Sequence, residues 1–148
     1  MPRQGKMTKL MAFTSGRRVL VVDDNRDSVE TLSTLLRMKG HDARVAADGE
    51  QAISVADEYH PHVVILDLSL PGLDGYEVAE ALRNRSYRAD MVLVALTGWS
   101  GQDVRNKAAE AGFDFHLLKP VDWEALQQVL EAAPAAPQTA PTFQDTSS

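Results

Sequence analysis

Polar side chains that could carry out chemistry stand at the ends of short apolar runs in this chain. They are Asp23 and Asp24, Asp67, Thr97 and Lys119, which stand at the carboxyl ends of these runs. In an open parallel sheet, the carboxyl ends of the strands line one crevice, where ligands bind. Three carboxylates, a hydroxyl and an amine would therefore meet in a small space. Such a group is suited to holding a divalent cation and receiving a phosphoryl group.

Asp67 ends the most apolar run, and the loop residues after it leave its carboxylate open. A carboxylate can attack a phosphoryl donor and form a mixed anhydride. Asp23 and Asp24 beside it would repel an incoming phosphate. A hard cation removes that repulsion, because magnesium accepts carboxylate oxygens and neutralises the charge that builds up during transfer. The three acids together therefore predict a Mg²⁺ site.

Lys119 and Thr97 complete the predicted site. The amine of Lys119 offers a mobile positive charge to phosphoryl oxygens, and the hydroxyl of Thr97 can donate a hydrogen bond to another. Pro120 follows Lys119 directly, and an X-Pro bond adopts the cis form at modest cost. We hypothesise a cis Lys119–Pro120 bond that turns the lysine toward the crevice.

Strand and helix patterns alternate along the chain. The apolar runs predict strands, whereas apolar residues at helical spacing between them predict helices. Runs that are apolar at every position are typical of strands buried on both faces of a parallel sheet. We therefore predict an α/β fold, a three-layer doubly wound (βα)5 sandwich with the flavodoxin-like strand order 2-1-3-4-5. The predicted strands are 19–22, 43–46, 63–66, 91–96 and 115–118.

Helix boundaries follow from capping residues. The segment Asp23–Asn25 can cap the first helix, Gly40 can end it, and Asp122 can cap the last helix. Capping alone would explain Asp23 and Asp24, and Asp67 alone would be an ordinary loop residue. Four polar strand ends converging by chance is improbable, which favours the phosphoryl site. The apolar face predicted for the first helix comprises Val29, Leu32, Leu35, Leu36 and Met38.

Composition indicates a small acidic module. The chain has 148 residues with 44% hydrophobic content, which is enough for one folded domain. Its net charge of −6 argues against nucleic acid or a membrane surface as a partner. The chain has no cysteine, which is compatible with the cytoplasm. We expect a flexible N-terminal extension over 1–16, the folded domain over 17–131 and a disordered Ala/Pro-rich tail over 132–148.

Four motifs resemble the receiver domain of two-component response regulators. They are VLVVDDN at 19–25, VVILDLSLPGLDGYEV at 63–78, ALTG at 95–98 and LLKPVD at 117–122. The resemblance covers about residues 17 to 131, and four motifs in the right order are far more specific than any one of them.

The resemblance implies a role for each position of the site. Asp67 corresponds to the phosphoacceptor, Asp23 and Asp24 to the acidic pair that holds magnesium, and the backbone carbonyl of Ser69 to a further metal ligand. Thr97 resembles the switch hydroxyl and Lys119 the phosphoryl-binding lysine. In this family a histidine kinase donates the phosphoryl group and the domain itself catalyses the transfer. Two surfaces then rearrange to alter partner binding: that of the fourth strand and fourth helix, and that of the fourth helix, fifth strand and fifth helix.

His116 departs from the family pattern, which usually places Tyr or Phe three residues before the lysine. Imidazole titrates near physiological pH, so we hypothesise a weaker or pH-sensitive switch at His116. The alternative is that His116 is merely a solvated strand residue. The other histidines, His41, His60 and His62, lack ligand spacing and are predicted to lie at the surface.

Two rival functions fit these residues less well. A haloacid-dehalogenase-type phosphatase would carry a second acid two residues after the nucleophile, where this chain has Ser69. A flavin-binding module would need a neutral phosphate-binding loop after the first strand, where Asp23 and Asp24 would repel phosphate. We therefore expect no turnover of external substrates, only self-catalysed phosphorylation and dephosphorylation.

The expected partners are proteins. They are a histidine kinase or histidine phosphotransfer protein that supplies the phosphoryl group, and a downstream protein target. Only 15 residues follow Ala133, so we expect output by protein contact rather than through an attached domain. A receiver module detached from a hybrid histidine kinase, acting as a relay or phosphate sink, stays open as an alternative, and the oligomeric state is not predicted.

Overall fold

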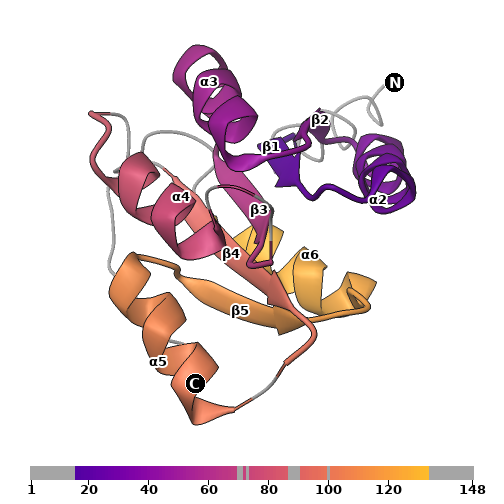
Figure 1. Cartoon of the computed structure of the whole chain (residues 1–148). Helices are drawn as coiled ribbons and strands as arrows, with labels where there is room; N and C mark the ends of the chain where they lie inside the picture. The colour runs from indigo at the N-terminus through magenta and orange to yellow at the C-terminus, as the bar shows by residue number, and fades with distance from the viewer. Residues whose placement is uncertain (1–15, 70–71, 73, 87–90, 100, 134–148) are drawn as a thin grey trace, which may run out of the picture.

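The computed structural model describes residues 16–69, 72, 74–86, 91–99 and 101–133. Within these ranges, strands and helices alternate from the first element to the last (Figure 1). The strands are β1 (Arg18–Val22), β2 (Asp42–Ala46), β3 (Val63–Asp67), β4 (Val92–Thr97) and β5 (Phe115–Leu118). The helices are α2 (Arg26–Met38), α3 (Gly49–Tyr59), α4 (Gly75–Arg83), α5 (Gln102–Ala111) and α6 (Trp123–Ala132).

The strands form one five-stranded parallel sheet in the order β2-β1-β3-β4-β5. Figure 1 shows α2 and α6 on one side of this sheet and α3, α4 and α5 on the other. The predicted doubly wound sandwich and its strand order are therefore confirmed. Because the order reverses between β1 and β3, the crevice expected at a switch point lies beside Asp23 and Asp67.

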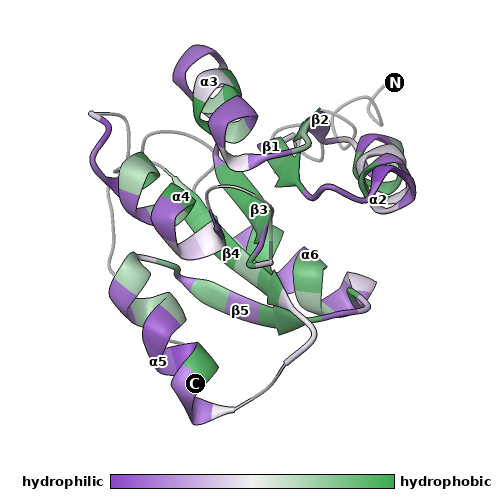
Figure 2. Ribbon diagram, in the orientation of Figure 1, coloured by the Kyte–Doolittle hydropathy of each residue, from purple (hydrophilic) through white to green (hydrophobic). Residues whose placement is uncertain are grey.

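Two hydrophobic clusters fill the space between the layers. Alternate residues of each central strand point to opposite faces, so Leu20 and Val64 join one cluster while Val19 and Val63 join the other. Figure 2 shows the apolar strands enclosed by helices whose outer faces are hydrophilic. All five residues of β3 are buried, which explains why this run lacks the polar alternation of a half-exposed strand.

The first helix differs from its prediction at Met38. Val29 and Leu36 are buried, but Met38 is 76% exposed. Successive residues of an α-helix are rotated by about 100°, so Met38, nine positions after Val29, lies on the opposite side. The side chain of Asn25, rather than an aspartate of the predicted capping segment, accepts the capping hydrogen bond from the Ser28 N–H.

The two ends of the described fold are tied together. The Arg17 Nε–H donates to the Ala133 carbonyl at 3.1 Å, and both residues are buried. Helix α6 reaches Ala132, one residue past the expected domain boundary. The predicted extension and tail otherwise lie outside the described residues, as do Leu70 and Pro71 of the loop after β3. None of the helices described here combines the length and apolar character needed to cross a membrane.

Candidate phosphoacceptor site

The parallel sheet brings the predicted site residues to one edge. Asp67 is the last residue of β3, Thr97 is the last residue of β4, and Asp23 and Lys119 directly follow β1 and β5. One carboxylate oxygen from each of Asp23, Asp24 and Asp67 lies within 4.8 Å of the others. The expected convergence of charged strand ends is thus present in the structure.

The carboxylate of Asp67 is held at both oxygens. Lys119 Nζ donates to Oδ2 at 2.8 Å, while the backbone N–H and the hydroxyl of Ser69 both donate to Oδ1 at 3.0 Å. Burial by itself raises the pKa of Asp67, but the hydrogen bonds from Lys119 and Ser69 outweigh burial and lower this pKa below its ordinary value. Asp67 is therefore ionised at neutral pH, as a carboxylate nucleophile must be.

Asp23 is in a less favourable position for a negative charge. It is buried, and burial together with the negative charge of Asp67 raises its pKa above the ordinary value, although the hydrogen bond from the Asn25 N–H opposes the increase. Lys119 Nζ is 3.9 Å from Asp23 Oδ2. One ammonium thus faces two buried carboxylates, and the exposed Asp24 adds a third acid at the rim.

The acidic cluster fits a hard divalent cation. Carboxylate oxygens are the ligands that Mg²⁺ takes, and three of them converge with a single ammonium for compensation. A cation here would relieve the repulsion that raises the pKa of Asp23. The Ser69 carbonyl stays a predicted ligand, since the contacts given for Ser69 involve its N–H and hydroxyl.

Lys119 remains charged in this setting. Burial alone would lower its pKa, but the hydrogen bond to Asp67 and the charges of Asp67 and Asp23 raise it above the ordinary value. The Lys119–Pro120 peptide bond is cis, the geometry hypothesised from the sequence. The Lys119 N–H also donates to the Thr97 carbonyl at 2.9 Å, which joins the ends of β4 and β5.

Thr97 ends β4, the strand that lies between β3 and β5 in the sheet. Its side chain is buried, and Oγ1 accepts a hydrogen bond from the Trp99 N–H at 3.1 Å. The hydroxyl proton thus stays available for another acceptor. The indole of Trp99, by contrast, is 73% exposed at the rim.

Gly75 and Asp74 fix the far side of the loop after Asp67. A Cβ on Gly75 would lie 2.7 Å from the Leu68 Cα and 2.9 Å from the Asp67 carbonyl oxygen, so only glycine allows this approach. Asp74 caps α4 in a reciprocal capping box with Glu77. The sequence indicated a permissive loop glycine at Gly75 but not this packing requirement.

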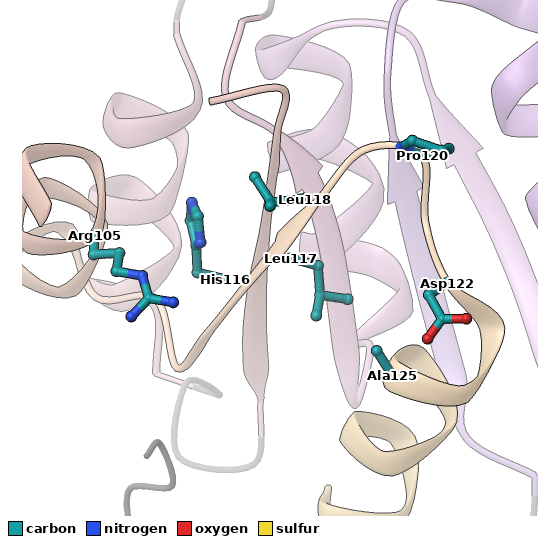
Figure 3. Close-up of a pocket in the computed structure, with 7 residues that line it drawn as sticks. All are labelled: Arg105, His116, Leu117, Leu118, Pro120, Asp122 and Ala125. Carbon is teal, nitrogen blue, oxygen red and sulfur yellow. The ribbon is translucent and has the colours of Figure 1, made fainter. Parts of the chain in front are cut away.

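His116 lies on the strand next to Thr97, paired with Ala95 across β4 and β5. Figure 3 shows its ring beside Arg105 in a pocket of about 330 Å³ along β5. The ring is partly buried, and its Nε2 is buried without a hydrogen-bond partner in the described part of the chain. Burial and the positive charge of Arg105 lower the pKa of His116. The alternative prediction that His116 is merely a solvated strand residue is therefore wrong, while its switch role stays a prediction.

Two predictions about polar residues need correction. His41 and His62 are partly buried and accept backbone hydrogen bonds, so they are not simple surface residues. Asp122 occupies the N-cap position of α6, but its side chain accepts no capping hydrogen bond. It lines the pocket with His116 instead (Figure 3).

Sequence comparison places the chain in a known family. Residues 19–131 match the response regulator receiver domain, and the chain belongs to this family. It is 38% identical over 110 residues to the probable transcriptional regulator ycf27 of Porphyridium aerugineum, covering 74% of this chain and 45% of that protein. The chain thus spans less than half the length of this relative. It is also 30% identical over 119 residues to protein PilG of Pseudomonas aeruginosa, covering 80% of this chain and 88% of PilG.

Solved structures agree with this assignment. The chemotaxis protein CheY4 of Vibrio cholerae has a TM-score of 0.76 and 27% identity, with 81% of this chain and 100% of CheY4 covered. The receiver domain of the sensor histidine kinase PA1611 of Pseudomonas aeruginosa, solved with magnesium in its active-site cleft, has a TM-score of 0.71 and 30% identity. That match covers 79% of this chain and 96% of the PA1611 domain.

A further neighbour was solved as a complex. The receiver domain of Ssk1 from Saccharomyces cerevisiae was crystallised with the histidine phosphotransfer protein Ypd1. It has a TM-score of 0.72 and 30% identity, covering 78% of this chain and 87% of the Ssk1 chain. The structural neighbours thus include a receiver domain bound to a histidine phosphotransfer protein.

Proposed function

We propose that this receiver domain is a signalling switch that accepts a phosphoryl group on Asp67 from a histidine kinase or a histidine phosphotransfer protein. The observation that carries the proposal is the position of Asp67: its buried carboxylate meets two further acids within 4.8 Å and the Lys119 ammonium at 2.8 Å. Two structural neighbours support this class of donor: the Ssk1 receiver, solved with a histidine phosphotransfer protein, and the PA1611 receiver, which belongs to a sensor histidine kinase.

The chemical step is a phosphoryl transfer between two proteins. One Asp67 carboxylate oxygen forms a bond to phosphorus while the bond from phosphorus to the donor's imidazole nitrogen breaks, and the imidazole keeps that electron pair. Lys119 and the Thr97 hydroxyl stabilise the negative phosphoryl oxygens. The Lys119 ammonium already lies 2.8 Å from the Asp67 carboxylate in the structure.

Mg²⁺ is the cofactor expected for this step, and when bound it neutralises negative charge on the transferring group. Asp23, Asp24 and Asp67 would hold it, together with the Ser69 backbone carbonyl. The raised pKa of Asp23 supports this assignment, because a cation lowers the cost of ionising a buried acid beside another acid.

We infer that the output is protein contact with a downstream target in the cytoplasm, without turnover of external substrates. Ser69 stands two residues after Asp67, and its hydroxyl donates to the Asp67 carboxylate. A serine at this position offers no carboxyl group to protonate leaving groups, which argues against a phosphatase.

Intact mass spectrometry after treatment with a small phosphodonor and Mg²⁺ tests the proposal. We expect one added phosphoryl group in the wild type, none in Asp67→Asn, and strongly reduced labelling in Lys119→Ala. Lys39→Ala, which changes a lysine over the Trp123 ring on α6, is the matched control and should label normally. Labelling that persists in Asp67→Asn, or wild type that does not label, contradicts the proposal.

A second candidate is a relay or phosphate-sink receiver related to hybrid histidine kinases. The observation favouring it is the PA1611 receiver, which belongs to a sensor histidine kinase and shares the fold at 30% identity. Incubating the phosphorylated protein with an unphosphorylated histidine phosphotransfer protein separates the two functions. Rapid return of the phosphoryl group to histidine supports a relay, whereas retention on Asp67 supports a terminal switch.

A further inference from the structure

Two histidines accept hydrogen bonds from the start of β1, at the end of the sheet opposite the acidic site. His41 precedes β2 and its Nδ1 accepts a hydrogen bond from the Arg17 N–H at 3.1 Å. His62 precedes β3 and its Nδ1 accepts from the Arg18 N–H at 2.8 Å. Since β2 and β3 flank β1 in the sheet, one imidazole approaches β1 from each side.

These hydrogen bonds continue the parallel ladders beyond the strand ends. The Asp42 N–H donates to the Arg17 carbonyl at 2.9 Å, and the His62 N–H donates to the Arg18 carbonyl at 2.8 Å. The carbonyls of Arg17 and Arg18 are thus paired by backbone groups, while their N–H groups are paired by imidazole nitrogens. A side-chain acceptor at each position replaces the backbone acceptor that a longer strand would supply.

Both histidines must be neutral to do this. An imidazole accepts at Nδ1 only when its single proton is on Nε2, and a protonated ring is a donor at both nitrogens. Burial and the positive charge of Arg17 lower the pKa of His41, which keeps this ring neutral at pH 7.

The charges around the pair reinforce this condition. The positive charge of Arg17 disfavours protonation of His41, and the Arg18 guanidinium donates to the His60 carbonyl at 2.6 Å. On the β2 side, the Asp42 carboxylate already accepts from the Tyr59 hydroxyl at 2.6 Å. The negative charge of Glu131 on α6 raises the pKa of Arg17 and so opposes the effect of burial. The Arg17 cation therefore opposes protonation of His41, and the neighbouring Asp42 carboxylate is already hydrogen-bonded to Tyr59.

We propose that His41 and His62 form an acid-sensitive clasp on the start of β1: proton uptake breaks both hydrogen bonds and loosens this strand at the end opposite Asp23. The histidine clasp does not depend on the proposed phosphoryl chemistry. It makes the stability of the fold respond to pH just below neutrality through residues remote from the acidic site.

The direction of the pH dependence follows from the linkage between proton binding and folding. A histidine whose pKa is lower in the folded than in the unfolded protein stabilises the fold above its unfolded pKa, and this stability is lost as pH falls through the folded pKa. Each hydrogen bond lost should increase the unfolding equilibrium constant by roughly tenfold. The effect sets in below about pH 6.5, the ordinary histidine pKa.

Asparagine tests the clasp because its amide oxygen can accept the same N–H without taking up a proton. We expect His41→Asn/His62→Asn to fold at about pH 8 and to show a smaller rise in the unfolding constant than wild type between about pH 7 and 5. His60→Asn, which changes the neighbouring exposed histidine, should keep the wild-type pH dependence. Identical pH profiles for wild type and the double variant overturn the proposal.

NMR titration of the wild-type imidazoles gives a test that does not require the variants to fold. The proposal expects the Nε2–H tautomer for both rings and a His41 pKa below the ordinary value. A ring that is already protonated at about pH 7, an Nδ1–H tautomer or an unshifted His41 pKa overturns the proposal. Labelling with the small phosphodonor at about pH 7.5 should be equal in wild type and double variant, so a failure of the clasp is distinguishable from a failure of the proposed function.

Discussion

Replacing Asp23 by Asn should stabilise the metal-free protein and remove its response to Mg²⁺. Asp23 is 6% exposed, and its pKa is raised by burial and by Asp67. The ionised side chain therefore costs folding free energy at neutral pH. Asparagine has nearly the same shape, and its Oδ1 can keep the hydrogen bond from the Asn25 N–H.

The size of the effect follows from two opposing interactions. At an effective dielectric constant of about 20, charges on Asp23 and Asp67 that lie within 4.8 Å of each other repel by at least about 3.5 kcal/mol. The attraction between Asp23 and Lys119 at 3.9 Å would be about 4 kcal/mol by the same formula, but Lys119 is 36% exposed and screening reduces it to roughly 2 kcal/mol. Repulsion and desolvation together outweigh this attraction, so we expect a gain of about 1–3 kcal/mol.

Urea unfolding with EDTA and with Mg²⁺ measures both effects. In EDTA, wild-type stability from this group is present below the ordinary Asp pKa and is lost as pH rises through the raised pKa of Asp23, whereas Asp23→Asn lacks this loss. Asp24→Asn is the matched control: its carboxylate is exposed, so the gain in EDTA should be smaller while Mg²⁺ binding still weakens. An Asp23→Asn protein no more stable than wild type in EDTA refutes the reasoning.

Further predictions concern the loop, the core and the switch position. Gly75→Ala should destabilise the fold by about 1–3 kcal/mol in urea unfolding, because its Cβ meets the Leu68 backbone at 2.7 Å, whereas Gly98→Ala, with nothing within 4 Å, should change it by less than about 1 kcal/mol. Leu66→Ala removes a fully buried side chain and should cost about 2–5 kcal/mol, against about 0.5 kcal/mol or less for the exposed Met38→Ala. For His116→Tyr, NMR shifts induced by phosphorylation should be independent of pH between about 5.5 and 8. Wild-type shifts should weaken at the acidic end as His116 takes up a proton, and equal shifts in the two proteins count against a pH-sensitive switch.

The fold was predictable because the sheet is parallel and enclosed on both faces. Runs such as Val63–Leu66 are apolar at every position, which identifies buried strands without any alternation to interpret. Helix faces were less certain. Met38 follows Leu35 and Leu36 closely enough to seem part of one stripe, yet the rotation per residue carries it to the solvent side.

The site was predictable to the extent that it consists of strand ends. Topology alone brings Asp23, Asp67 and Lys119 together once the strand order is known. The second hydrogen bond from Ser69 to Asp67 was not foreseen, because it depends on the side-chain rotamer and the turn after β3. Likewise, the requirement for glycine at Gly75 depends on how closely α4 approaches Leu68.

The histidines were missed for a related physical reason. Spacing reveals metal ligands only when side chains share one element, whereas His41 and His62 belong to different connections and meet on either side of β1. Their task is to accept hydrogen bonds from backbone N–H groups, which leave no mark in the sequence. Burial favours the protonated acid at Asp23, directly after β1, and favours the neutral base at His41, which contacts the start of the same strand. Both ends of β1 thus stabilise the metal-free fold most when uncharged, but acidification protonates Asp23 favourably and the histidine clasp unfavourably. As pH falls, the metal-free protein should therefore lose stability through the histidine clasp and regain stability through Asp23, and Asp23→Asn should make the loss on acidification more pronounced.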